Sequence, residues 1–189
     1  MRIRPKILPL LSILFLFGCQ DQDVHTYRIA KEHAEAPSNA APTGDLAWKI
    51  PANWKTLPAS GMRLASFAFE GKSGSKADIS IVVLPGMAGG DLANVNRWRG
   101  QLGLEPLNEA SIVAHSQKIK SKAGALLMVD FAGTDPKGEI RGKARMLGAM
   151  LSLRDKQWFF KVMGEDPVVT QAKPSFLQFL KSIKPASNS

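Results

Sequence analysis

The residues that most clearly suggest a binding or catalytic site lie between Asp78 and Leu104, in the stretch DISIVVLPGMAGGDLANVNRWRGQLGL. Its glycine-rich turn, PGMAGG, precedes an expected helix, and backbone N–H groups at a helix start can bind phosphate. The turn lacks the Lys-Ser/Thr pair of a Walker loop and the G-x-G-x-x-G spacing of dinucleotide-binding folds. Asp91 at the expected N-cap would occupy the same N–H donors. Nucleotide binding is therefore not expected.

The helix expected over 91–102 carries a second group of polar residues. An apolar stripe recurs at three- and four-residue spacing, which is typical of a helix packed on a core: Leu92, Val95, Trp98 and Leu102. Asn94, Arg97 and Gln101 share another face, and Arg99 flanks the stripe with Asn96. Because Trp98 belongs to the stripe, the Arg-Trp-Arg sequence does not indicate nucleic-acid binding. The candidate partner-binding face is Asn94, Arg97, Gln101 and Arg99, and a solvated helix face is the alternative.

A row of basic residues marks another possible contact surface. Arg141, Lys143 and Arg145 alternate with Gly142 and Ala144, so their side chains share one face of an expected strand. This basic strand could bind an anionic polymer or phospholipid head groups. A charged, solvent-facing strand is the commoner meaning of such alternation.

Catalytic chemistry has little support in the sequence. A hydrolase needs a nucleophile with a base, or paired carboxylates, and neither G-x-S-x-G nor H-E-x-x-H occurs. His115 is the one histidine of the expected folded domain, and Asp130, Asp135 and Glu139 flank turns as solvated acids would. No catalytic residue, cofactor or metal is expected. An envelope hydrolase whose site is assembled in space remains the alternative.

The N-terminus predicts export and lipidation. Three basic residues in the first six are followed by an apolar run, Ile7 to Phe17, which is shorter than the ~20 residues of a membrane span and indicates a signal peptide. Leu16-Phe17-Gly18-Cys19 resembles the lipobox of bacterial lipoproteins. The resemblance implies that residues 1–18 are removed and that acyl chains, such as palmitate, are attached to Cys19. The alternative is an ordinary secretory signal.

The predicted anchor fixes the expected compartment. Several acyl chains hold a protein on a membrane where one chain binds only marginally, so the protein is expected in the cell envelope, facing the periplasm. Gln20 stands where an inner-membrane retention signal would usually have Asp, which favours the outer membrane by analogy. Cys19 is the single cysteine of the chain, so no intrachain disulfide is expected.

The chain then divides into four parts. After the signal peptide, residues 19–44 are expected to be a lipidated tether, because 37–44 is rich in Pro, Ser, Asn and Gly. His25 and His33 lie in this tether without further ligands at metal-binding spacing, and residues 24–35 fit a helix or a strand equally. Residues 45–185 are the expected globular domain, and 186–189 form a tail.

Within the domain, alternation and turn signals predict mostly antiparallel strands. A nearly uninterrupted apolar run at 79–84 indicates a strand inside the sheet, and Trp48 and Trp54 are more typical of a core edge than of a sugar-stacking platform. Asp166-Pro167 predicts a helix start, and Pro174 should kink that helix or begin a second one. The other expected strands are 62–69, 112–119, 125–132, 139–153 and 157–163.

Composition agrees with a globular chain and adds a basic charge. Of 189 residues, 44% are hydrophobic and 22% are charged, and the formal net charge is +9. Without the first 18 residues, 22 basic and 16 acidic residues leave +6. This excess favours anionic surfaces at low salt and is too diffuse to name a partner.

Three segments resemble the PsbP-type fold and its bacterial lipoprotein relatives: WKIPANW at 48–54, LPGMAGGDLANVNRWRGQLGL at 84–104, and WFFKVMGEDPVV with KPSFLQFLKSIK in the C-terminal part. The resemblance covers 46–184 and implies an α+β fold, namely an α/β/α sandwich on a mostly antiparallel sheet of about six strands, with a mid-chain and a C-terminal helix. Members of this fold do unrelated things, so it supplies no catalytic residues.

The expected function follows from these parts together. The chain is expected to be a lipid-anchored, non-catalytic binding or accessory protein of the cell envelope. Its expected partners are the membrane, through acyl chains on Cys19, and an envelope protein or anionic polymer; no nucleic acid is expected.

Overall fold

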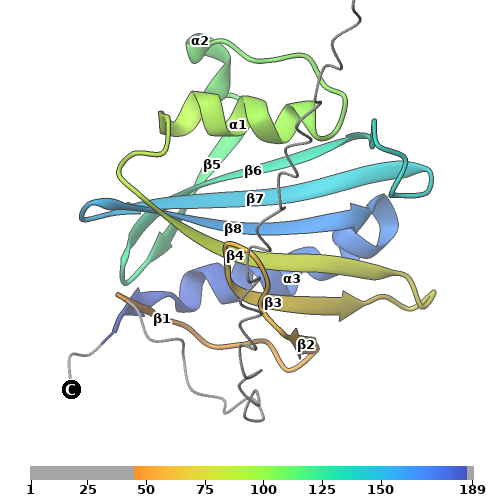
Figure 1. Ribbon diagram of the computed structural model, residues 1–189, viewed down its shortest axis with the longest axis horizontal. Coiled ribbons are helices and arrows are strands. Elements are labelled where there is room, and N and C mark those ends of the chain that lie inside the picture. The colour runs from red at the N-terminus through yellow and green to blue at the C-terminus, as the bar shows by residue number, and fades with distance from the viewer. Residues whose placement is uncertain (1–44, 187–189) are drawn as a thin grey trace, which may run out of the picture. The chain divides into compact units, whose positions relative to one another are not determined.

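The computed structural model describes residues 45–186, so the predicted signal peptide, the tether and Cys19 lie outside the described residues. Seven strands form one antiparallel sheet in the order β2-β3-β4-β8-β7-β6-β5 (Figure 1). They are β2 (Trp54–Leu57), β3 (Arg63–Glu70), β4 (Lys76–Pro85), β5 (Ser116–Ser121), β6 (Gly124–Thr134), β7 (Lys143–Leu153) and β8 (Lys156–Glu165). A short pair, β1 (Leu46–Ala47) with β9 (Lys184–Pro185), joins the two ends of the described chain.

Helices lie on both faces of this sheet, which confirms the predicted α+β sandwich with a mostly antiparallel sheet. They are α1 (Gly90–Gly100), α2 (Glu109–Ile112) and α3 (Asp166–Ser182). The predicted hairpins are antiparallel as short connections require. The segment from α1 to β7 separates β4 from β8 in sequence. The two strands are nevertheless neighbours, and β4 pairs with β8 from Asp78 to Pro85. The apolar run of β4 is therefore interior, as predicted, while β8 occupies the middle of the sheet.

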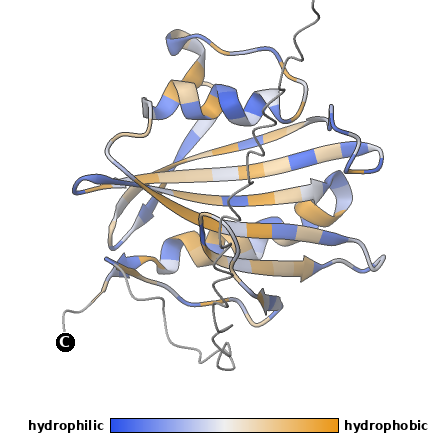
Figure 2. Cartoon of the chain, in the orientation of Figure 1, coloured by the Kyte–Doolittle hydropathy of each residue, from blue (hydrophilic) through white to orange (hydrophobic). Residues whose placement is uncertain are grey.

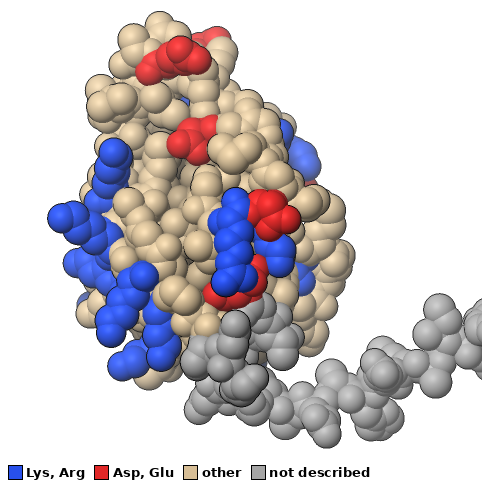
Figure 3. Space-filling model, turned by 90° about the vertical axis from the view of Figure 1, so that its left-hand side faces the viewer, with Lys and Arg blue, Asp and Glu red and all other residues tan. Residues whose placement is uncertain are grey.

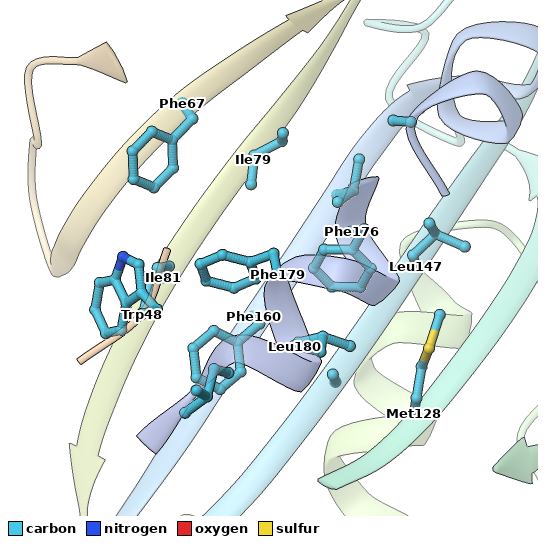
Figure 4. Packing of buried hydrophobic residues seen from close by; sticks show 14 of the residues in the cluster. Trp48, Phe67, Ile79, Ile81, Met128, Leu147, Phe160, Phe176, Phe179 and Leu180 are labelled. Atoms are coloured by element: carbon cyan, nitrogen blue, oxygen red, sulfur yellow. The ribbon is translucent and has the colours of Figure 1, made fainter. Parts of the chain in front are cut away.

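One face of the sheet and α3 enclose the larger core. Alternate residues of the strands point to this face, among them Phe67, Ile79 and Phe160, and they meet Phe176 and Phe179 of α3 (Figure 4). Each such side chain contributes about 1.5–3 kcal/mol when it is fully removed from water. Figure 2 shows that hydrophobic residues predominate along the central strands and that polar residues gather at the turns.

Trp48 and Trp54 belong to this core, being 7% and 6% exposed. Trp54 packs against Phe179 with ring centroids 5.0 Å apart, and its Nε1 donates to Oγ of Ser175 at 3.0 Å. The core-edge interpretation of the two tryptophans is thus confirmed, and neither ring is available as a sugar-stacking platform.

Pro174 lies inside a single continuous helix, α3. Its ring is on the exposed side, and the residue four positions earlier, Thr170, is exposed as well. Water can therefore bond to the carbonyl that proline leaves without an N–H donor. The sequence left a kink and a second helix open, and the structure shows one helix.

Three local predictions are wrong. The expected strand 112–119 begins only at Ser116, because Asn108 caps the short helix α2 by accepting the N–H of Ser111 at 2.9 Å. The strand expected from 139 begins at Lys143. The N-cap of α1 is Gly89 with φ 90°, a conformation that glycine adopts readily, and not Asp91.

Candidate functional site

A cleft of about 690 Å³ opens on the face of the sheet that carries α1. Figure 1 shows α1 on the side of β6 and β7, away from β2 and β3. The cleft lies where this helix leaves the sheet uncovered. Its lining comes from β3, β4, β8, the end of α1 and the β6–β7 loop: Arg63, Lys76, Asp78, Arg97, Gly100, Gln101, Asp135, Pro136, Lys137, Glu139, Ile140, Lys161, Met163 and Gly164.

Close packing holds α1 at the edge of the cleft. The ring of Trp98 lies directly on Gly148 of β7, where a Cβ atom would overlap it. At the end of the helix, the N–H of Thr134 donates to the carbonyl of Leu102 at 3.0 Å, and Gly133 leaves no space there for a Cβ. These contacts fix the last turn of α1, and with it the side chains that face β8.

The loop between β6 and β7 is shaped by Asp135. Its carboxylate accepts the backbone N–H groups of Lys137, Glu139 and Ile140 at 3.0, 2.7 and 2.9 Å. These hydrogen bonds, that of Lys137 first, hold the pKa of Asp135 below its ordinary value. Asp135 is therefore committed to folding the loop, as a turn-flanking acid.

The cleft carries more positive than negative charge. Five of its residues are basic and three are acidic. Asp78 forms a two-pronged ion pair with Arg63, at 2.8 and 2.9 Å. Four basic side chains have no ion-pair partner within 45–186: Lys76, Arg97, Lys137 and Lys161.

Lys161 is the most confined of these charges. It lies on β8 between Phe159 and Met163, on the face beneath α1, and is half-buried. Its Nζ donates to Oε1 of Gln101 at 3.2 Å. Burial lowers the pKa of Lys161, against the smaller effect of the Asp78 charge. Lys161 thus lines the cleft with a neutral hydrogen-bond partner.

The structure brings two residues of the predicted partner-binding face into the cleft, Arg97 and Gln101. Asn94 is 1% exposed, so its predicted exposure is wrong. Its Nδ2 donates to the carbonyls of Ala88 and Gly90 at 3.0 and 2.7 Å, and its Oδ1 accepts from Arg97. Asn94 thus secures the glycine turn and orients Arg97.

Arg99 lies away from the cleft. Its Nε donates to the carbonyl of Glu105 at 2.6 Å, and its guanidinium stacks over Phe131 at 4.9 Å from the ring centroid. Both contacts support the loop that follows α1. Arg99 and Arg97 therefore serve different surfaces.

The predicted basic strand is not a row of free charges. Arg145 donates to Asp130 at 2.8 and 2.9 Å and to Asp166 at 2.9 Å, and Lys143 lies 3.5 Å from Asp166. Arg141 is exposed and precedes the strand. The interpretation of Arg145 as a free surface cation is corrected, because it joins β6 and β7 to the start of α3.

Of the remaining acid and histidine candidates, Glu139 lines the cleft, whereas Asp130 and His115 lie outside it. Asp130 is on the α3 face, where Arg145 and Lys173 bind it. Nδ1 of His115 lies 2.9 Å from the carbonyl of Ser111. Within residues 45–186 no group of three His, Cys, Asp or Glu side chains is arranged to hold a metal ion.

The sequence interpretation missed Lys161, Lys76, Lys137 and the Arg63–Asp78 pair. One signal for Lys161 was present, because it interrupts the apolar alternation of Phe159 and Met163 on a buried strand. Charged residues are rarely buried without a partner. The other cleft residues become neighbours only through the pairing of β3, β4 and β8.

No family model matches the chain, and no curated protein matches it. Among solved structures, it is similar to LpqN, which is involved in cell envelope biogenesis of Mycobacterium tuberculosis. The sequence identity is 11%, the match covers 79% of this chain and 86% of LpqN, and the TM-score is 0.49.

A second similar structure is PsbP (CyanoP) of the cyanobacterium Synechocystis sp. PCC 6803, at 12% identity, with 82% of this chain and 97% of that chain covered and a TM-score of 0.45. A Bacteroides thetaiotaomicron structure matches at 8% identity and TM-score 0.44, over 76% of this chain and 46% of that chain. A PsbP protein is thus among the similar structures, as the sequence resemblance indicated. Likeness at this level assigns no function.

No helix in the described part of the chain is long and apolar enough to cross a membrane.

Proposed function

We propose that this protein is a non-catalytic, lipid-anchored protein of the cell envelope whose cleft binds an anionic group of a ligand or partner. The observation that carries the proposal is the half-buried Lys161, which has no carboxylate within ion-pair distance among residues 45–186. A buried charge that lacks an opposite charge destabilises the fold. An anion bound at Lys161 would offset this cost.

The surroundings of Lys161 suit an anion. Arg97 and Lys76 line the same cleft, and neither has an ion-pair partner among the described residues. A phosphate or carboxylate seated between these cations would make charge-assisted hydrogen bonds, each stabilising by about 1.5–3 kcal/mol. The apolar side chains of Ile140 and Met163 would exclude water from part of the site.

Two of the three acids of the cleft support binding over catalysis. General acid–base chemistry needs a carboxyl whose pKa lies near the working pH. Asp135 has a lowered pKa and is held by backbone N–H groups, and Asp78 is paired with Arg63. These two carboxylates are therefore committed to contacts within the protein, and Glu139 is the third acid of the cleft.

Calorimetric titration with pyrophosphate and, separately, succinate at low ionic strength tests the cleft. The wild-type chain should bind at least one probe, and Lys161→Met should weaken this binding by about tenfold or more. Lys72→Met removes an equal charge from an exposed position outside the cleft and should leave it unchanged. Failure of both probes to bind the wild type, or equal weakening by both variants, would refute the cleft as an anion site.

The lipid anchor has its own test, in cells. The wild-type protein should fractionate with the outer membrane and incorporate labelled palmitate, whereas Cys19→Ser should enter the soluble envelope fraction. A Cys19→Ser protein that remains membrane-bound like the wild type would rule out lipidation as the cause of membrane attachment.

A further inference from the structure

A second depression, of about 590 Å³, is lined by segments at β1, the β5–β6 turn, the end of α3 and β9. Figure 1 shows β1 and the end of α3 at the other end of the sheet from the β6–β7 loop, which lines the cleft. The lining residues of the depression are Ala47, Trp48, Lys49, Lys122, Lys181, Ser182 and Lys184. Four of the seven residues are lysines and none is acidic. We call Lys49, Lys122, Lys181 and Lys184 the lysine surface.

Four separate segments contribute these lysines, and backbone contacts hold the segments together. The N–H of Lys49 donates to Oγ of Ser182 at 3.0 Å, and the N–H of Lys122 donates to the carbonyl of Ile183 at 3.1 Å. Lys184 is held by the pairing of β9 with β1. The lysine surface is therefore a product of the tertiary fold and not of one charged sequence run.

The four side chains are exposed and lack ion-pair partners within 45–186. The nearby acid Asp45 already binds Arg154 and Lys156, at 3.0 and 2.9 Å. The negative end of α3 favours Lys181 and Lys184 near it. That effect does not account for Lys49 and Lys122, which come from other elements.

Further basic residues extend the positive charge. Lys118 and Lys120 are exposed on β5, the edge strand that leads to Lys122. Figure 3 shows lysine and arginine side chains gathered along one margin at this end of the molecule, with acidic side chains elsewhere on the face. A surface of one sign attracts a broad surface of the opposite sign.

We propose that the lysine surface docks on a bilayer rich in anionic phospholipid head groups. Clusters of four to eight basic residues bind such bilayers, because each lysine near the surface adds a similar favourable increment. Lysine suits this contact, since its hydrated ammonium group requires no fixed geometry of the phosphate.

The path of the chain supports the bilayer as the occupant. The described chain begins at Asp45, immediately before β1, and Ala47 of β1 and the following Trp48 line the depression. The segment from Cys19 to 44 therefore joins the domain beside the lysine surface. If Cys19 is acylated, which rests on the proposed function, the membrane-attached segment is joined to the domain next to the lysine surface.

Docking in this way would point the cleft away from the membrane. Strand β6 has 11 residues; Lys122 lies two residues before it, and Asp135 of the cleft directly follows it. At 3.3 Å per residue, about 35 Å separates the two sites along the strand. The cleft would then face the aqueous compartment, open to a partner.

Vesicle partitioning of the full chain tests the proposal. The measured quantity is the ratio of partition coefficients for vesicles with one-third phosphatidylglycerol and for pure phosphatidylcholine vesicles. The N-terminal segment contributes the same apolar binding to both kinds of vesicle, so its contribution cancels in this ratio. Lys122→Gln/Lys184→Gln should lower the ratio by about 25-fold at low salt, at about fivefold per lysine, and Lys49→Gln/Lys181→Gln should do the same.

Lys55→Gln/Lys72→Gln is the charge-matched control, because both lysines are exposed and lie outside the depression. Its ratio should stay within about twofold of the wild type. Lys161→Met should also leave the ratio unchanged, which separates this proposal from the cleft. A wild type without preference for anionic vesicles, or an equal loss in the control pair, would overturn the proposal.

Discussion

Lys161 of β8 and Gln101, which directly follows α1, are joined by a hydrogen bond of 3.2 Å across one wall of the cleft. The partner of the ammonium group is thus a neutral amide oxygen. Such a bond orients the lysine without cancelling its charge. The positive charge remains available to an anion, and the free protein carries the free-energy cost of keeping it half-buried.

The first prediction concerns that cost. Lys161→Met should raise the free energy of unfolding by about 1 kcal/mol, since it replaces an unpaired charge by an apolar side chain of similar length. Urea denaturation measures this free energy. The control Lys72→Met, at an exposed position, should change the free energy of unfolding by less than about 0.5 kcal/mol. A loss of more than about 1 kcal/mol in Lys161→Met would instead identify Lys161 as a structural residue.

The second prediction is a pH dependence. The folded pKa of Lys161 lies below its ordinary value of 10.5, mainly because burial disfavours the charged form. Between the folded and the unfolded pKa the unfolded chain binds more protons, so this group makes stability rise with pH in that interval. The stability difference between Lys161→Met and wild type should shrink as pH approaches 10.5 from below. A constant difference from pH 7 to 10.5 would contradict a lowered pKa.

The third prediction concerns the support of α1. Gly148→Ala should destabilise the fold by about 2 kcal/mol, because the new Cβ overlaps the ring of Trp98 and displaces the helix. Anion binding should weaken as well, since α1 carries Arg97. Gly100→Ala is the control for stability, because a Cβ there meets nothing within 4 Å. Unchanged stability in Gly148→Ala would show that the helix is loosely held.

The fourth prediction concerns the ion pairs on the α3 face. Arg145→Met should destabilise by about 2 kcal/mol, because it leaves Asp130 and Asp166 without their main partner. The ratio of its partition coefficients for anionic and neutral vesicles should fall no further than that of Lys72→Met, which also removes one surface charge. A variant with wild-type stability and a specific loss of vesicle binding would restore the basic strand as a contact surface.

The same network has a pH signature in acid. Burial raises the pKa of Asp130, yet hydrogen bonds and charges of Arg145 and Lys173 together outweigh it, so the folded pKa is below 3.8. A lowered carboxyl pKa stabilises the fold above the unfolded value, and that stability is lost as pH falls through the folded pKa. Asp130→Asn should therefore flatten the loss of stability below about pH 4.

Local patterns in the sequence predicted most of the fold. In the expected strand 157–163, two-residue alternation predicts Trp158, Phe160 and Val162 on one face and Phe159 on the other, and the structure places them in this way. Helical spacing placed Val95 and Trp98 in the core. These patterns succeed because each strand and helix is stabilised mainly by burying one apolar face, and that face repeats with the period of the element.

The site depended on contacts that no local pattern contains. Asn94 occupies a polar helix position, and its burial results from the preceding turn folding back over it. The charge of Arg145 is paired with Asp166, which lies 21 residues later in the sequence. Lys161 meets Gln101 only because the sheet and the end of α1 pack together in the folded chain. Pairings of this kind follow from the assembled sheet, which single-element periodicity does not specify.

The most direct measurement is the titration of Lys161 itself. NMR of ¹³Cε-labelled lysines, with Lys161→Met to assign the signal, gives the pKa of this amine with and without pyrophosphate. We predict a pKa below the ordinary 10.5 in the free protein and a clear rise when pyrophosphate binds, because an anion stabilises the charged form. An ordinary pKa in the free protein that pyrophosphate does not change would contradict the cleft as an anion site.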